Sequence, residues 1–229
     1  MSIAARRLAT FTSVITFALC CVSAPARASD KSEAESLVTK SRTTIQALAN
    51  DPDFAAMKSA LAHAKAVLIF PQVLRAGFVL GGSGGSGVLL ARDASTGAWI
   101  GPAFYTMGSA SIGLQAGASS AEMVMVVNSQ KALDSLHTNK LKLGADASAA
   151  LGPKGVQKGV AVNADFIVYS KVKGAFAGVA VDGSVLDVRQ TLNTAYYGPT
   201  ATPIEILVKR SVNNPDAAML QAAVAETAK

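Results

Sequence analysis

The sequence contains very little cysteine or histidine. Its 229 residues include two cysteines, Cys20 and Cys21, and two histidines, His63 and His137. Beyond residue 21 the chain can therefore form no internal disulfide, thiolate metal site or cysteine nucleophile. The histidines lie far apart, and no H-E-x-x-H or comparable metal-binding pattern contains either one. We expect a non-catalytic protein with no catalytic residues, no bound metal and no cofactor.

Charged residues are also scarce. They make up 16% of the chain against 50% apolar residues, and the net charge is +6. Residues 1–28 contain three arginines and no acid, so residues 29–229 carry 18 − 15 = +3. Nucleic-acid-binding proteins usually have a dense basic face. The composition therefore predicts no nucleic-acid partner and is compatible with mild attraction to anionic surfaces.

The first residues follow the order that export requires. Arg6 and Arg7 precede an uncharged apolar run, Leu8 to Val22, and the small-x-small motif Ala26-Arg27-Ala28 follows Pro25. The run is shorter than the roughly 20 apolar residues of a bilayer span. We expect residues 1–28 to be a signal peptide that is cleaved after Ala28, which places the mature protein in the periplasm.

Two other fates of this segment stay open. The apolar run can be retained as a membrane anchor. Lipid modification at Cys20 or Cys21 would give an outer-membrane lipoprotein, although neither cysteine follows the usual small residue.

Helices are expected at both ends of the mature chain. Ser32-Glu33-Ala34-Glu35 has the form of a capping box and predicts a helix over 33–49, and Asp51-Pro52 starts a second one. Their apolar residues recur at helical spacing and either face the domain core or insert into a membrane. Two C-terminal helices are predicted from Thr202-Pro203 and Asn214-Pro215.

Strands dominate the region between these helices. Alternation from Ser109 to Gly117 indicates a strand with one small, polar face, and Met123 to Val127 indicates a strand that is buried on both faces. Repeated glycine in strand sequence favours a strongly curved sheet. We predict one α+β domain over 29–229, with a mainly antiparallel, strongly curved or barrel-like sheet. Its expected parts are N-terminal helices 32–64, a β-rich core 65–198 and C-terminal helices 202–227.

The glycine-rich run Gly81 to Gly87 matches one dinucleotide-binding motif and one hydrolase motif by composition. G-x-G-x-x-G and G-x-S-x-G both require a helix directly after the loop. Here Val88 to Arg92 has strand character instead. We therefore interpret the run as a flexible hairpin connection.

Several separate motifs resemble the SYLF family of lipid-binding domains. They occur in order from about Ala66 to Gly198 and include Trp99 to Phe104, Leu143 to Pro153 and Gly174 to Val179. Ile100 stands where the family pattern commonly has serine. The resemblance implies non-catalytic binding of anionic phospholipid, with phosphoinositide-like or phosphatidic-acid-like headgroups. With the export signal, we expect this binding to occur at a bacterial envelope.

Together with the amphipathic N-terminal helix, the resemblance directs attention to nearby basic side chains. The predicted lipid-binding residues are Lys40, Arg42, Lys58, Lys65 and Arg75. The expected partner is an anionic phospholipid membrane surface. The alternative is an envelope structural or protein-interaction module, whose partner is another envelope protein.

Overall fold

The computed structural model describes residues 26–77, 80–112, 117–137, 140–152, 164–174, 181 and 183–229. Residues 1–25, which hold most of the predicted signal peptide, lie outside these ranges. Within the ranges, no helix combines the length and apolar character that a membrane span needs.

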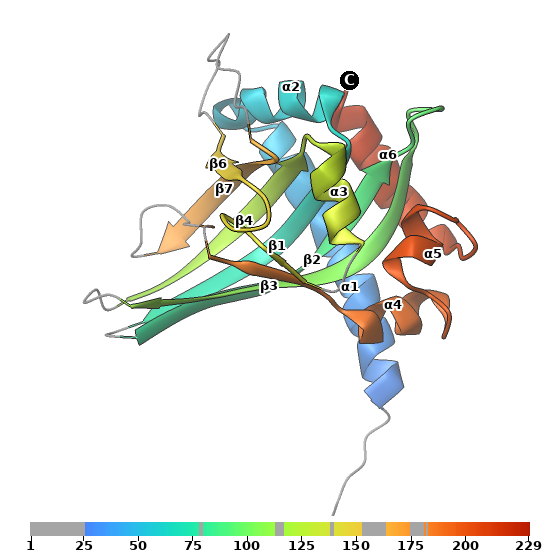
Figure 1. The fold of residues 1–229 in the computed structure, drawn as a ribbon, viewed down its shortest axis with the longest axis horizontal. Helices are drawn as coiled ribbons and strands as arrows, with labels where there is room; N and C mark the ends of the chain where they lie inside the picture. The colour runs from blue at the N-terminus through green and yellow to red at the C-terminus, as the bar shows by residue number, and fades with distance from the viewer. Residues whose placement is uncertain are drawn as a thin grey trace, which may run out of the picture.

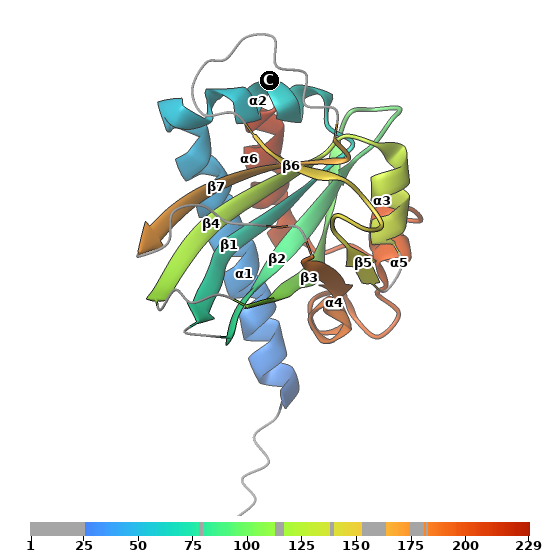
Figure 2. The same cartoon turned by 60° about the vertical axis from the view of Figure 1, so that its left-hand side comes forward.

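Eight strands form one curled, half-barrel sheet (Figures 1 and 2). In chain order they are β1 (Ala66–Gly77), β2 (Leu80–Arg92), β3 (Trp99–Ile112), β4 (Gly117–Val127), β5 (Lys140–Lys142), β6 (Ala149–Leu151), β7 (Phe166–Gly174) and β8 (Val185–Val188). Their order across the sheet is β5-β8-β3-β2-β1-β4-β7-β6. Only the β6–β7 pair is parallel. The predicted α+β class, with a mainly antiparallel and strongly curved sheet, is confirmed.

Helices cover both faces of this sheet. They are α1 (Ala26–Ala49), α2 (Ala55–His63), α3 (Gln130–Leu136), α4 (Gln190–Tyr197), α5 (Pro203–Leu207) and α6 (Ala218–Thr227), with short 3-10 turns at η1 (Pro52–Phe54) and η2 (Pro215–Ala217). Helices α1, α2, α4 and α6 pack on one face, which we call the α1 face. Helices α3 and α5 pack on the opposite, α3 face.

The central strands contribute to both cores. In β1, Val67 and Ile69 pack on the α1 face, whereas Leu68 and Phe70 pack on the α3 face, and all four are fully buried. The run Met123–Val127 in β4 is likewise buried throughout. Such continuous burial is why these segments are apolar at every position instead of at alternate ones.

Three helix starts follow the predicted capping chemistry, and one does not. Side-chain oxygens of Asp51, Thr202 and Asn214 accept from backbone N–H groups of η1, α5 and η2. Ser32, in contrast, lies inside α1, which begins at Ala26. The capping-box prediction for Ser32 was therefore wrong, because the helix continues N-terminally through residues that also favour it.

The alternating segment from Ser109 to Gly117 does not form one strand. Residues up to Ile112 belong to β3 and Gly117 begins β4. These two strands are separated in the sheet by β2 and β1. Gly113 and Gln115, two members of the predicted polar face, lie outside the described residues.

The glycine-rich run is part of a central strand, so its interpretation as a hairpin connection was wrong. Residues from Gly81 to Gly87 belong to β2 and pair with β3 along their whole length. A Cβ atom at Gly85 would lie 2.3 Å from the Gln72 carbonyl oxygen, and one at Gly87 would lie 2.5 Å from the Phe70 ring. Glycine is needed here because β1 approaches β2 too closely for a side chain.

Candidate functional site

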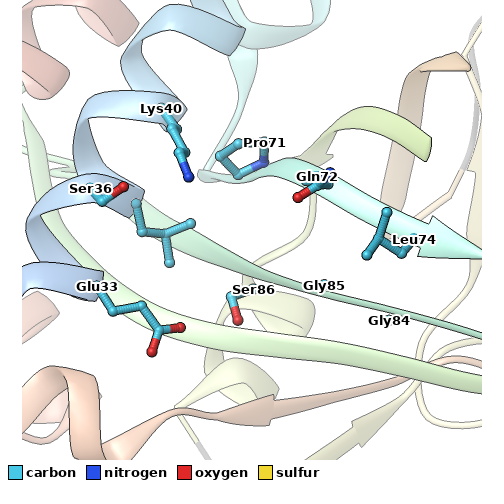
Figure 3. Close-up of a pocket in the computed structure, with 10 residues that line it drawn as sticks. Glu33, Ser36, Lys40, Pro71, Gln72, Leu74, Gly84, Gly85 and Ser86 are labelled. Carbon is cyan, nitrogen blue, oxygen red and sulfur yellow. The ribbon is translucent and has the colours of Figure 1, made fainter. Parts of the chain in front are cut away.

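An open groove separates the N-terminal half of α1 from strands β1 and β2 (Figure 3). Glu33, Ser36, Leu37 and Lys40 form its helical wall, at positions i, i+3, i+4 and i+7 of one helix face. The facing wall comes from two strands, and the enclosed volume is about 240 Å³. The strand residues are Pro71, Gln72, Leu74, Gly84, Gly85 and Ser86.

A β-bulge creates this space. The register of β1 shifts between Ile69 and Leu74 against β2, and between Phe70 and Val73 against β4. The extra residue bends β1 beneath α1. On β2, Gly84 and Gly85 place only backbone opposite the helix. The two glycines therefore leave open the part of the groove that side chains on β2 would otherwise fill.

The two ends of the groove differ in charge. Lys40 is exposed, and no salt bridge involves it in the part of the chain that the structure describes. At the other end the Glu33 carboxylate forms a salt bridge with the guanidinium of Arg189. The same guanidinium also donates to Ser86 Oγ at 2.8 Å. Leu74, on the strand wall of the same groove, has 55% of its surface exposed. The groove thus joins an unpaired cation to an exposed apolar side chain.

Of the five predicted lipid-binding residues, Lys40 alone lines the groove. Arg42 points to α6, where its Nη1 lies 3.3 Å from Met219 Sδ. Lys58 is exposed on α2, and Lys65 is exposed directly before β1.

Arg75 faces away from the groove. Val73 belongs to the core of the α3 face, and Arg75, two residues further along the strand, shares that side. Its strand neighbours there are Ser83 and Ser119. Lys40 and Arg75 therefore lie on opposite sides of the sheet.

The apolar residues of the N-terminal helices face the protein core. Leu37 is 8% exposed, Phe54 is 5% exposed, and Ile45 and Leu61 are fully buried. All four belong to the cluster that packs on the α1 face of the sheet. Of the two alternatives that the sequence leaves open, packing against the core is the one found.

The carboxylates of Asp93 and Asp165 are engaged in structural contacts. Asp93 accepts from the turn residues Ser95 and Thr96 and from Arg210. Hydrogen bonds from Ser129 and Ser148 lower the pKa of Asp165. These bonds favour the charged carboxylate and tie it to neighbouring segments.

Burial shifts the pKa of His137 and of Tyr169. The pKa of His137 is lowered, because desolvation of its half-buried ring outweighs the nearby Asp134 charge. Burial raises the pKa of Tyr169 to about 12, and its hydroxyl donates to the Ala56 carbonyl at 3.2 Å. Both groups therefore carry no charge near neutral pH.

The sequence profile of the Ysc84 family, described as "Las17-binding protein actin regulator", matches residues 108–227. This range is more than half of the chain. The chain belongs to the Ysc84 family. The resemblance to the SYLF domain, the domain of this family, is thereby confirmed. Arg189 lies within the matched range, whereas the α1, β1 and β2 walls of the groove precede it.

Relatives carry the same family name. Protein YSC84 of Saccharomyces cerevisiae is 36% identical over 165 residues, which cover 69% of this chain and 35% of the relative. LAS seventeen-binding protein 3 of that species is 35% identical over 157 residues, covering 66% of this chain and 34% of the relative. SH3 domain-containing YSC84-like protein 1 of Homo sapiens is 31% identical over 163 residues, which cover 69% of this chain and 47% of the relative. No solved structure matches the chain significantly.

The chain spans about a third to a half of these relatives. The description of the family and the name of LAS seventeen-binding protein 3 both refer to binding Las17, a protein.

Sequence reasoning missed Glu33, Ser86 and Arg189 as members of the site. The spacing of Glu33, Leu37 and Lys40 on one helix face was available as a signal. No comparable signal existed for Arg189, since it precedes α4, a helix that the sequence pattern did not predict.

Proposed function

We propose that this chain is a non-catalytic module that binds anionic phospholipid surfaces through the groove beside Lys40. The observation that carries the proposal is that the exposed, unpaired ammonium of Lys40 and the exposed side chain of Leu74 line the same open groove. An anionic headgroup would pair with the Lys40 ammonium, and the apolar part of a lipid would cover the Leu74 side chain.

The magnitudes imply weak, reversible binding. A basic side chain near an anionic membrane contributes about 1 kcal/mol, and burial of a leucine contributes roughly 1.5–3 kcal/mol. Together they give about 2.5–4 kcal/mol, which corresponds to a dissociation constant of about 1–15 mM. Stronger binding requires further basic residues, such as Lys58 and Lys65, to contact the same bilayer.

Co-sedimentation of residues 29–229 with phosphatidylglycerol vesicles tests the proposal. Lys40→Gln should weaken binding roughly fivefold, as the loss of one membrane-facing charge predicts. The matched control is Lys142→Gln, which removes an exposed lysine from the edge strand β5. It should leave binding nearly unchanged. Failure of the wild-type protein to bind phosphatidylglycerol, cardiolipin and phosphoinositide vesicles at low salt would refute the proposal.

A protein-binding module is the second candidate. The description of the family and the name of a yeast relative favour it, because they refer to a protein partner. The same Lys40→Gln variant separates the candidates. If the module binds lipid, the variant should bind protein-free vesicles more weakly than wild type does. If it binds only protein, neither wild type nor the variant should bind such vesicles.

Export to the periplasm, with cleavage after Ala28, is the cellular setting that we propose. The N-terminal pattern supports it, and cleavage there would remove the first three residues of α1. N-terminal sequencing of protein from the envelope fraction should begin at Ser29. A chain that begins at Met1, or at a lipid-modified Cys20 or Cys21, would contradict this setting.

A further inference from the structure

We propose that Arg189 is a second anion-binding residue of the groove and that Glu33 is a built-in competitor for it. This inference rests on the proposed function and adds a regulatory element to the same site. It gives a reason why the arginine that contacts Glu33 is paired, whereas no salt bridge involves Lys40 among the described residues.

The contacts place Arg189 at the end of the groove that lies opposite Lys40. Its two terminal nitrogens donate to the two Glu33 carboxylate oxygens, Nη2 to Oε2 at 3.2 Å and Nη1 to Oε1. Nη1 also donates to Ser86 Oγ at 2.8 Å. Glu33 and Ser86, the two side chains that accept from this guanidinium, both line the groove (Figure 3).

The base of the Arg189 side chain is firmly positioned. Its backbone N–H donates to the Phe104 carbonyl of β3 at 2.9 Å, and its carbonyl accepts from Leu192 and Asn193 at the start of α4. Glu33 is the freer partner, since 44% of its side chain is exposed against 26% for Arg189. Rotation of Glu33 into water would therefore release a guanidinium that stays in place.

A released guanidinium suits a phosphate. Its paired N–H groups bind phosphate and carboxylate oxygens in the same bidentate geometry, so a lipid phosphate can take the place of Glu33. Glu33 and Lys40 are seven residues apart, which is about 10 Å along the helix. The full site therefore suits an anionic headgroup that contacts both ends of the groove.

Competition has a measurable consequence. A phosphate that binds Arg189 must displace Glu33, which lowers the observed affinity. Glu33→Gln keeps the side-chain length and removes the charge, so it should raise affinity for phosphatidylglycerol vesicles. Coupling between two such groups is typically five-fold or more, and we expect an increase of roughly five- to tenfold.

A double-mutant cycle tests whether Glu33 acts through Arg189. Vesicle affinity is measured for wild type, Glu33→Gln, Arg189→Gln and the double variant, with melting temperatures in parallel. We expect Glu33→Gln to raise affinity in the wild-type background and to change it less than about twofold when Arg189 is absent. The charge-matched control is Glu35→Gln, which removes an acid of α1 that does not line the groove. It should have little effect.

Equal enhancement in both backgrounds would overturn the inference, because Glu33 would then act only by repelling the anionic surface. That result would leave the proposed function intact, provided that wild type binds and Lys40→Gln weakens binding. Absence of vesicle binding in every variant would refute the proposed function and this inference together. If Arg189→Gln unfolds at the assay temperature, Arg189→Lys replaces it. Lysine keeps the charge but not the bidentate geometry, so the Glu33→Gln effect should still shrink.

Discussion

At the scale of single residues, the contrast between two glycines shows what the groove requires. Gly85→Ala would place a methyl group 2.3 Å from the Gln72 carbonyl oxygen and 3.1 Å from Val73 Cα, both backbone atoms of β1. Overpacking of this kind costs about 1–3 kcal/mol. We expect urea denaturation to show a loss of at least that size in the free energy of unfolding.

Gly108→Ala is the matched control for this prediction. A Cβ atom at Gly108 meets nothing within 4 Å. Replacement of an unstrained glycine typically raises stability by about 0.4–1 kcal/mol, because the unfolded chain loses freedom. Equal destabilisation by both substitutions would show that strand glycine matters for chain flexibility and not for the close approach of β1.

Individual site residues were only partly predictable from the sequence. Lys40 could be found because it follows Leu37 at helical spacing on an amphipathic segment. Arg75 was grouped with it only by proximity in sequence, and the bulge at Pro71–Gln72 places it on the opposite face. A bulge is decided by contacts with neighbouring strands, which a local pattern does not contain.

At the scale of elements, α1 is held to the sheet by its apolar face. Ile45 is fully buried in the cluster on the α1 face, so Ile45→Ala should lower the free energy of unfolding by about 2–5 kcal/mol. Below the melting temperature, vesicle affinity should stay unchanged, because Ile45 does not reach the groove. Weaker vesicle binding by the folded variant would indicate instead that the apolar face of α1 leaves the sheet and enters the bilayer.

Elements with local signals were predicted well, and elements set by tertiary contacts were not. Asp51, Thr202 and Asn214 mark their helix starts through side-chain caps that depend on three or four consecutive residues. Helix α4 has no side-chain cap at Arg189 and was missed. Its Leu192 and Tyr196 are buried against the sheet and the N-terminal helix, so packing stabilises it.

At the scale of the whole molecule, the sheet is covered at one end and open at the other (Figure 2). Ala66–Phe70 are buried on both faces, whereas Ala76, Gly108, Ala110 and Ala118 are exposed. Local opening requires less free energy where few apolar contacts cover the backbone. Hydrogen exchange should therefore be slowest for amides in the first half of β1 and the second half of β4.

The open end should exchange faster, particularly at Ala76 and Ala118, even though these residues remain paired across the sheet. Uniform protection along β1 would contradict this gradient. It would indicate that the exposed end is covered in solution by a partner or a second copy.

The bulge in β1 also affects how the chain is compared with its relatives. Up to Phe70 the even-numbered residues of β1 point to the α3 core, and from Val73 onward the odd-numbered ones do. A relative that lacks one residue at positions 71–72 would exchange the two sides of its remaining strand. Its counterpart of Arg75 would then stand beside the groove and its counterpart of Leu74 would be turned inward. For this strand a one-residue gap in an alignment therefore changes which side chains face the groove, even where every aligned residue is identical.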